Sequence, residues 1–550
     1  MNKLFQGCFA LALLSAGPAL AKDTLTIGVA QFPASLNPYI SAQTVQYFTI
    51  GFATRPVSAY NPRGERVCLL CSELPNLEDK TAVIEDLPGG GKGMAVTLKI
   101  RPDLKWGDGE PVTSKDVEFT WRMAKSPDAG FIQTWAWNRA TKVDIVDAST
   151  VVLHLDKTYV SYQMWDYLLP EHLEAKLATG TGPAGAMDYI NKTLYNAAPT
   201  TPGLWNGPYI VSNYNSGNLI ELQPNPYWPG TAPDIKHVVV RLVDNTAALQ
   251  ANLLSGDVDF TPSGIGITTD QAVSLERDHK GMFQYFYHLG LSYERIDLNM
   301  DGPLKDLRVR QALLMGTDRK TLIDRLFFGH AVLALSWINE VEQFYTSDVA
   351  QYPYDPAKAK ALLAEAGYKP GPDGVGVNAA GQKLSFDFAT TSGNRIRELS
   401  QQVMQNQWKA IGVEVHITNQ PSRTFFGEYM RKRQFQGLAE YANSGRIGVP
   451  PTTYYASYNI PTAANNYNGM NWPGVNNPEF DRAMVAAETE LDPAKQKGLW
   501  IEMQKIYAAT LPELPLYFRQ DPDVVPTWLK GYDATGKEDY ITFFAEKWRN

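Results

Sequence analysis

The sequence predicts an α/β fold of two lobes, with an extra domain inserted into the first lobe. Its 550 residues are more than one hydrophobic core usually organises, so two or three domains are expected. A β-α-β order over residues 383–418 indicates an α/β unit in the second half of the chain. Strand-like runs at 286–299 and 511–519 predict two crossings between the lobes, which would serve as a hinge.

Residues 1–21 have the pattern of an export signal. A single cation, Lys3, precedes the apolar run FALALL at 9–14, and small residues end the segment. We expect cleavage after Ala21 and a soluble periplasmic protein, because the apolar run is far shorter than the ~20 residues that span a bilayer. Cys8 precedes the apolar run, so we interpret it as a signal residue and not as a lipid attachment site.

The composition is that of a folded, acidic protein. Hydrophobic residues make up 44% and charged residues 20% of the chain, a balance typical of a folded protein. The net charge of −8 argues against nucleic-acid binding, because proteins that bind nucleic acids use basic patches to neutralise phosphates.

Cys68 and Cys71 lie in a C-x-x-C spacing. In an oxidising compartment they are expected to form a short disulfide that fixes a loop. Thioredoxin-like redox chemistry would require the pair at the start of a helix in a βαβ setting, which RVCLLC at 66–71 does not show. A zinc site needs more ligands than this pair offers. No metal or cofactor is expected, because the histidines lack an i, i+4 pair; they occupy positions 154, 172, 237, 279, 288, 330 and 416.

The first lobe is expected to comprise residues 22–61, 206–285 and 520–550. LTIGVA at 25–30 predicts a buried strand, and FPASLNP at 32–38 predicts the loop at its carboxyl end, where ligands of open α/β sheets bind. Further elements are expected as strands at 219–223 and 238–242 and as a helix at 246–254 that ends at Gly256.

Residues 62–205 are expected to form the inserted domain. PGGGKG at 88–93 predicts a hairpin turn, and it lacks the G-x-x-x-x-G-K-[ST] order of a phosphate loop. Further along, the run RPDLKWGDGEPVTSKDVEFTW occupies 101–121. Within it, Thr113 can cap a helix whose third residue, Asp116, offers a carboxylate to free backbone amides.

The second lobe is expected to comprise residues 286–519. PLKDLRVRQALLMGTD at 303–318 predicts a helix. A second helix is predicted after Asp355, with Pro356 at its first position and Gly367 as its C-cap. The remaining elements are expected as strands at 383–389, 413–418 and 514–519, and as helices at 395–410, after Asn477 and after Asp492.

The run at 101–121 closely resembles the signature of the peptide/opine/nickel class of extracytoplasmic solute-binding proteins, family 5, which deliver ligands to ABC importers. Four other segments, at 207–209 (GPY), 224–228 (PNPYW), 303–318 and 355–368, are similar to the same family. The resemblance covers essentially the whole mature chain. It implies a periplasmic-binding-protein-like fold of type II, cluster C, as in oligopeptide- and dipeptide-binding proteins.

The resemblance also implies binding without chemistry. Open and closed forms of the two lobes would exchange, the solute would favour the closed form, and that form would dock on a membrane permease driven by an ATPase. The implied partners are therefore a small-molecule or oligomeric solute and the ABC permease and ATPase complex, with no nucleic acid. We expect the protein to be a monomer.

The family places ligand contacts in four loops of this chain. One loop follows the first strand, one follows the strand at 383–389, one follows residue 418, and the last covers 440–446. Trp135, Trp137 and Trp472 are possible stacking surfaces, because large flat side chains bury much area. The candidates in the loops are Phe32, Ala34, Ser35, Thr390, Thr391, Ser392, Asn394, Arg395, Arg423, Phe425, Tyr429, Tyr441, Asn443 and Arg446.

Arg446 bears on the choice of ligand. Peptide-binding members usually present an acid in the segment at 440–446, which holds the peptide amino terminus. Here ANSG is followed by Arg446, whose guanidinium suits a carboxylate, a phosphate or an acidic sugar. An opine, an oligosaccharide or a modified peptide is thus as well supported as an ordinary peptide. Alternatively, Arg446 pairs with Glu440 or another acid and does not face the cleft.

Other functional classes have weaker support. A G-x-S-x-G elbow is absent from the sequence, and a carboxylate pair for glycoside hydrolysis cannot be selected from 58 acids without geometry. A secreted polysaccharide- or peptide-degrading hydrolase is the alternative to a carrier, and turnover of a chromogenic substrate would support it. A periplasmic chaperone or sensor partner also remains open.

Overall fold

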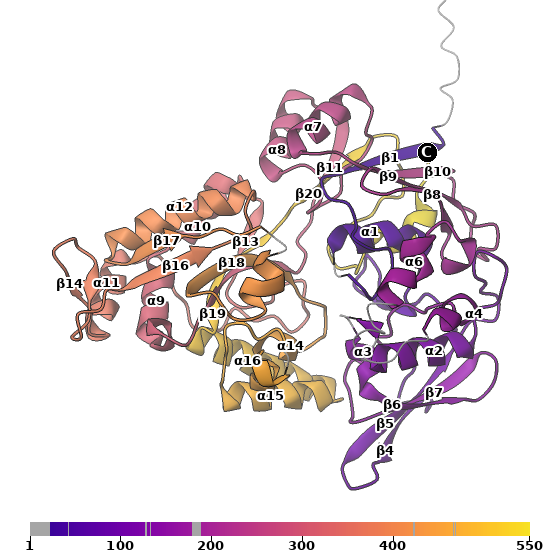
Figure 1. The fold of residues 1–550 in the computed structure, drawn as a ribbon, viewed down its shortest axis with the longest axis horizontal. Coiled ribbons are helices and arrows are strands. Elements are labelled where there is room, and N and C mark those ends of the chain that lie inside the picture. Colours follow the sequence, from indigo (N-terminus) through magenta and orange to yellow (C-terminus); the bar gives the residue numbers. More distant parts are fainter. Residues whose placement is uncertain are drawn as a thin grey trace, which may run out of the picture.

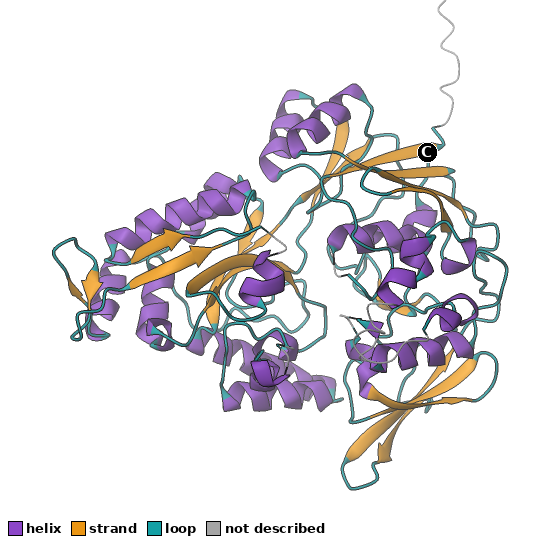
Figure 2. Ribbon diagram, viewed as in Figure 1, coloured by secondary structure: helices purple, strands orange, loops and turns teal. Residues whose placement is uncertain are grey.

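The computed structural model describes residues 22–41, 43–126, 129–131, 134–178, 189–421, 424–465, 467 and 469–550. The expected export signal and Arg423 lie outside these residues, as does the side chain of Trp135. Figure 1 shows two lobes side by side, with the chain passing between them near β11 and β20. A small domain, built on strands β4 to β7, extends the first lobe, and Figure 2 shows how helices and sheets are distributed between these parts.

The first lobe is built on a four-stranded sheet in the order β1-β10-β9-β8. Its first strand runs parallel to the neighbouring strand, with Leu25 opposite Val238, and Leu25, Ile27 and Val29 are fully buried. This burial explains the apolar run at 25–30. The elements of the lobe are β1 (Thr24–Val29), β8 (Tyr209–Asn215), β9 (Leu219–Pro224), β10 (His237–Leu242), α1 (Thr44–Ala53), α7 (Thr246–Ser255) and α8 (Thr269–Asp278).

The small domain has a four-stranded antiparallel sheet in the order β4-β5-β7-β6. The hairpin predicted at 88–93 is confirmed, and Gly89, Gly90 and Gly91 all have positive φ, which glycine adopts without strain. The domain shares one continuous hydrophobic core with the first lobe. Its main elements are β4 (Ala82–Asp86), β5 (Lys92–Lys99), β6 (Ala140–Ile145), β7 (Thr150–Leu155) and α2 (Ser114–Lys125).

The helix cap predicted in the run at 101–121 is present. Thr113 and Asp116 form a reciprocal capping box at the start of α2. The carboxylate of Asp116 accepts hydrogen bonds from the backbone N–H of Thr113 at 2.7 Å and of Glu171 at 2.8 Å. Asp116 is buried, and burial raises its pKa to about 6. Thr113 and Asp116 therefore have a structural role in this run.

The second lobe contains a six-stranded mixed sheet in the order β13-β19-β12-β18-β16-β17. The β-α-β unit predicted over 383–418 is confirmed, with β16 parallel to both β17 and β18. The elements of this lobe are β12 (Ser292–Leu298), β13 (Ala331–Leu333), β16 (Ser385–Ala389), β17 (Glu414–Ile417), β18 (Gly437–Ser444), β19 (Glu513–Arg519), α9 (Leu307–Met315), α10 (Arg319–Leu326), α11 (Pro356–Glu365), α12 (Arg395–Ala410), α15 (Pro478–Thr489) and α16 (Pro493–Thr510).

The prediction of one continuous helix over 303–318 is wrong. A 3-10 turn (Pro303–Lys305) comes first, α9 then ends at Met315, and a new helix begins after Asp318. The side chain of Asp306 accepts a hydrogen bond from the backbone N–H of Arg308 at 2.9 Å, and that of Asp318 accepts one from Thr321 at 3.0 Å. Each aspartate therefore starts a separate helix. In α11 the C-cap is Ala366, and Gly367 follows it with a φ of 93°.

The long strand predicted over 286–299 is in fact two strands. The first, β11 (Phe283–Tyr287), pairs with β20 (Pro522–Pro526), whereas β12 pairs with β18 and β19 in the second lobe. The strand must break because the chain leaves one sheet and enters another. Residues 288–291 and 520–521 therefore connect the lobes.

The remaining elements are short. Cys68 and Cys71 are joined by a disulfide at the end of the hairpin formed by β2 and β3. These elements are β2 (Ser58–Tyr60), β3 (Arg66–Cys68), β14 (Lys369–Pro370), β15 (Gly376–Val377), α3 (Trp135–Arg139), α4 (Glu171–Glu174), α6 (Leu194–Ala197), α14 (Thr452–Tyr455), the π-helix Phe425–Met430 and a final 3-10 helix (Ile541–Lys547).

Replacing Asp116 by Ala should lower the free energy of unfolding by about 2 to 4 kcal/mol, because the cap is lost and the part-buried N–H of Glu171 loses its acceptor. Urea denaturation followed by circular dichroism measures this loss. The control is Lys115→Ala, since Lys115 is exposed in the same helical turn. Equal stability of the two variants would show that the capping box does not hold this region.

Candidate functional site

A cleft of about 680 Å³ lies between the two lobes. The first lobe and the small domain contribute α1, residues 164–167 and residues 534–543, whereas the second lobe contributes the end of β18 and residues that follow it. The crossing segments also reach the cleft through His288 and Asp521. A ligand in this cleft would touch both lobes and both connections between them.

Aromatic rings line both sides of the cleft. On the first-lobe side, Tyr47 stacks on Tyr167 with ring centroids 6.1 Å apart and lies 5.5 Å from Tyr540. On the second-lobe side, Tyr441 and Trp472 have centroids 5.5 Å apart. Such surfaces bind apolar and planar groups, with polar groups left to fix orientation.

Charged groups of both signs also line the cleft. Arg446 of the second lobe donates a hydrogen bond to Asp166 of the first lobe, with Nη1 and Oδ1 3.1 Å apart. Burial alone would lower the pKa of Arg446, but Asp166 and Asp539 outweigh burial and raise it. The other charged residues of the lining are Arg66, Arg519, Lys537, Asp521, Asp523 and Glu538.

The lobes also meet away from the crossings. The carboxylate of Glu488, at the end of α15, forms an ion pair with Lys157 of the small domain and lies 3.7 Å from Arg139. The backbone N–H of Val160 donates to the carbonyl oxygen of Glu488 at 2.8 Å, and the hydroxyl of Ser161 donates to the carbonyl oxygen of Gly448 at 3.3 Å. The two lobes are thus in a closed arrangement around the cleft.

A buried ion network lies behind the second-lobe wall. The guanidinium of Arg295 pairs with Asp297 at 2.9 Å and with Glu513 at 2.8 Å. The hydroxyl of Tyr441 donates to Asp297 at 2.5 Å and accepts from Arg295 at 2.8 Å. All these groups are buried, so the network fixes Tyr441 in the wall of the cleft.

Four residues predicted from the sequence lie in the cleft wall. They are Tyr441, Asn443, Arg446 and Trp472, all from the second lobe. One alternative drawn from the sequence is that Arg446 pairs with Glu440 or another acid. Arg446 does have an acidic partner, which is Asp166 and not Glu440. Because the pair itself lies in the cleft, Arg446 both pairs with an acid and faces the site.

The first-lobe candidates lie elsewhere. Phe32 packs against Tyr214 with ring centroids 5.9 Å apart, and the backbone N–H of Ala34 donates to Gln43. Ser35 is buried and donates to Asn196 at 2.6 Å. Trp137 is fully buried, and its indole N–H donates to the hydroxyl of Tyr39 at 2.8 Å. These contacts are internal to the first lobe and the small domain.

The other second-lobe candidates support the wall from behind. Phe425 is fully buried in an aromatic cluster with Tyr441 and Trp472, and Tyr429 packs against that cluster. Asn394 caps α12 by accepting a hydrogen bond from the N–H of Arg397 at 3.2 Å. The lining of the cleft does not include the loop candidates Thr390, Thr391, Ser392, Asn394 and Arg395.

Sequence reasoning missed several residues of the wall. Asp166, Tyr47 and Tyr540 come from segments that are distant in sequence and meet only in the folded protein. Phe426 was missed although its neighbour Phe425 was selected. When two adjacent aromatic residues lie in a helix-like turn, usually one is buried and the other points outward. This pattern could have indicated Phe426 as the residue that faces the cleft.

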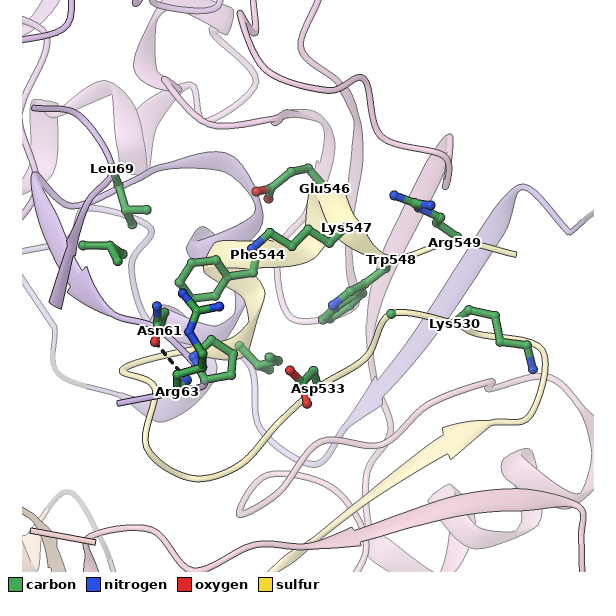
Figure 3. A pocket seen from close by; sticks show the side chains of 14 residues that line it. Asn61, Arg63, Leu69, Lys530, Asp533, Phe544, Glu546, Lys547, Trp548 and Arg549 are labelled. Carbon is green, nitrogen blue, oxygen red and sulfur yellow. Dashed lines mark hydrogen bonds between the residues drawn. The ribbon is translucent and has the colours of Figure 1, made fainter. Parts of the chain in front are cut away.

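A second hollow, of about 720 Å³, lies within the first lobe (Figure 3). Its lining includes Asn61, Arg63, Lys530, Phe544 and Trp548, and no residue of the second lobe. It is slightly larger than the inter-lobe cleft, but a ligand there would not touch both lobes. The inter-lobe cleft is therefore the candidate site.

Within the described residues, no cluster of three or more His, Cys, Asp or Glu side chains could hold a metal ion. Over the same parts of the chain, no helix combines the length and the apolar character that a membrane span requires.

Comparison with known proteins identifies the family. The model for "Bacterial extracellular solute-binding proteins, family 5 Middle" matches residues 91–468, more than half of the chain. The chain belongs to this family. The resemblance drawn from the sequence is confirmed.

Several relatives share most of the length of this family 5 protein. The oligopeptide-binding protein AppA of Bacillus subtilis is 26% identical over 490 residues, covering 86% of this chain and 84% of AppA. The murein peptide-binding protein MppA of Escherichia coli is 24% identical over 475 residues and covers 80% of each chain.

Solved structures confirm the two-lobe α/β fold. An oligopeptide-binding protein from Thermus thermophilus, complexed with a pentapeptide, is 30% identical, covers 96% of both chains and has a TM-score of 0.82. NikZ from Campylobacter jejuni, in complex with Ni(L-His), is 20% identical with a TM-score of 0.79 over 96% of this chain and 100% of NikZ. At this identity, the second match shows the fold alone.

Replacing Glu513 by Gln should change how stability depends on pH. Burial raises the pKa of Glu513 to about 7, although Arg295 acts in the opposite direction. Because this value exceeds the ordinary 4.5, the carboxyl contributes stability that is complete at low pH and is lost as pH rises through 7. The unfolding free energy of the wild type should therefore fall relative to Glu513→Gln between about pH 5 and about pH 8.

Urea denaturation at several pH values measures this difference. Glu502→Gln, at an exposed position of α16, is the matched control. Its unfolding free energy should depend on pH in the same way as that of the wild type. If the unfolding free energy of Glu513→Gln shows the same pH dependence as that of the wild type, Glu513 does not take up a proton between about pH 5 and about pH 8.

Proposed function

We propose that this family 5 protein is the periplasmic peptide-binding subunit of an ABC importer. The observation that carries the proposal is the inter-lobe cleft of about 680 Å³, which has aromatic walls and charges of both signs. A volume of this size is typical of small-molecule sites. The match at 30% identity to a protein solved with a pentapeptide supports a peptide as the solute.

The charges of the cleft favour a zwitterionic solute, such as a peptide, over an acidic sugar. Asp166 already accepts a hydrogen bond from Arg446, so this guanidinium is not reserved for an anion. The acids Asp523 and Asp539 line the same cleft, as do the cations Arg519 and Lys537. A zwitterion would find partners for both ends. Opines and oligosaccharides are tested as ligands in the calorimetry experiment described below.

The proposal includes export and delivery. Cleavage after Ala21 would release the chain into the periplasm, where a monomer would bind its solute and dock on a permease and ATPase complex. The two connections of the lobes, at 288–291 and 520–521, are short enough to allow rotation with few changes in φ and ψ. A solute would favour the closed form only by contacting both lobes.

Isothermal titration calorimetry of the mature chain tests the proposal. Trialanine should bind saturably, and mass spectrometry should recover it unaltered. Trigalacturonic acid and octopine serve as the acidic sugar and the opine. Failure of trialanine and other short peptides to bind would contradict the proposal, and so would their cleavage, which would favour the hydrolase.

The ion pair between Arg446 and Asp166 should contribute to ligand affinity, because it joins the lobes in the closed form. Arg446→Gln and Asp166→Asn should each weaken trialanine binding roughly fivefold, the effect of a partly exposed pair worth about 1 kcal/mol. The double variant should be no weaker than either single variant, since the same interaction is lost.

Calorimetry of the three variants measures this coupling. Arg63→Gln is the control, since Arg63 pairs with Glu65 on the surface and its side chain is 75% exposed. Unchanged affinity in both single variants would mean that the pair does not stabilise the closed form. Additive losses would mean that the two residues act separately on the ligand.

A further inference from the structure

Three aromatic rings form one corner of the second-lobe wall. The ring centroids of Phe426 and Tyr441 are 5.7 Å apart, those of Phe426 and Trp472 are 6.2 Å apart, and those of Tyr441 and Trp472 are 5.5 Å apart. All three residues line the cleft. Each ring thus packs against the other two, and together they form one aromatic patch in the wall.

The rings differ in exposure. Phe426 is 36% exposed, whereas Tyr441 is 3% and Trp472 is 8% exposed. Met470, which is 37% exposed, lines the same cleft. Large apolar side chains that stay exposed in a cleft lose no water until a ligand covers them, so their burial is available to stabilise a complex.

The backbone places Phe426 in the cleft. It belongs to the π-helix Phe425–Met430, a rare geometry that is frequent at functional sites. Phe425 is fully buried beneath it and packs edge-on against Phe426, with centroids 4.9 Å apart. One phenylalanine therefore anchors the turn, and the next presents its ring to the cleft.

The other two rings are buried, and hydrogen bonds hold the ring of Tyr441 in place. Tyr441 is fixed by Asp297 and Arg295, and the guanidinium of Arg295 lies 4.6 Å from the centroid of the Tyr441 ring. The backbone carbonyl of Trp472 accepts a hydrogen bond from Arg433 at 2.9 Å. Rings that are already fixed lose little conformational freedom when a ligand binds, which favours affinity.

The charged groups that contact these rings have partners. Arg295 and Asp297 pair with each other at 2.9 Å behind the wall. A charged ligand group pressed against the three rings would lose water without gaining an opposite charge from them. An aromatic ligand group would gain area and the edge-to-face contacts that aromatic pairs prefer.

We propose that Phe426, Tyr441 and Trp472 form a specificity subsite that takes an aromatic side chain of the bound peptide. This inference rests on the proposed function and adds a preference within it. The subsite selects by ring contacts, so it distinguishes a phenylalanine side chain from an aliphatic side chain of similar size.

Calorimetry with a matched set of peptides tests the subsite. Trialanine is compared with Phe-Ala-Ala, Ala-Phe-Ala and Ala-Ala-Phe, and the best of these with its cyclohexylalanine analogue, which keeps the size but lacks the aromatic ring. Phenylalanine at one position should improve affinity about tenfold or more over trialanine. The cyclohexylalanine analogue should bind several-fold more weakly than the phenylalanine peptide.

Variants connect the preference to the rings. Phe426→Ala should abolish the gain that phenylalanine gives over trialanine, and Phe426→Leu, which keeps an apolar side chain, should lose most of that gain. The control is Phe328→Ala, because Phe328 is 52% exposed and is not part of the cleft lining. Phe328→Ala should show the same affinity gain from phenylalanine as the wild type.

The outcomes separate the inference from the proposed function. If no peptide binds, the proposed function fails and the subsite fails with it. If peptides bind without a preference for phenylalanine, or the preference survives in Phe426→Ala, the subsite is refuted while peptide binding stands. Equal gains from phenylalanine and cyclohexylalanine would refute an aromatic subsite.

Discussion

Two short connections, residues 288–291 and 520–521, constrain the whole molecule. On one side of each connection, β11 pairs with β20, and on the other side β12 pairs with β19. Both lobes are therefore tied to these crossings by paired strands, and only a few residues lie between the two sets of strands. The cleft owes its position to this arrangement, since its walls are two bodies that meet beside the connections.

The contacts on the far side of the cleft follow from the same constraint. On this side α15 of the second lobe lies against the small domain, where Glu488 pairs with Lys157. Arg446 and Asp166 meet within the cleft itself. The two cations are partly exposed, with 24% of the Lys157 side chain and 35% of the Arg446 side chain accessible, so solvent weakens both ion pairs.

Local chemistry made much of the fold predictable. The bounds of α12 were predicted from its amphipathic pattern, and the cap of α2 from Thr113 and Asp116. The break at residues 288–291 was not predictable, because it depends on which sheet each half of the run joins. The helix break near Asp306 and Asp318 could have been predicted, because each aspartate precedes a helix that it caps.

The site was harder to predict than the fold. Trp137 and Trp472 look alike in sequence, yet Trp137 is part of a core and Trp472 lines the cleft, because only the tertiary arrangement decides which surface each ring covers. Asp166 could not be selected as a partner of Arg446, because 280 residues separate them and the pair forms only when the lobes meet.

The central claim is that two hinged lobes close on a solute and release it unaltered. Small-angle X-ray scattering of residues 22–550, with and without a peptide at a concentration that calorimetry shows to be saturating, tests this claim most directly. A smaller radius of gyration is expected in the presence of peptide. An unchanged radius at full occupancy would contradict it.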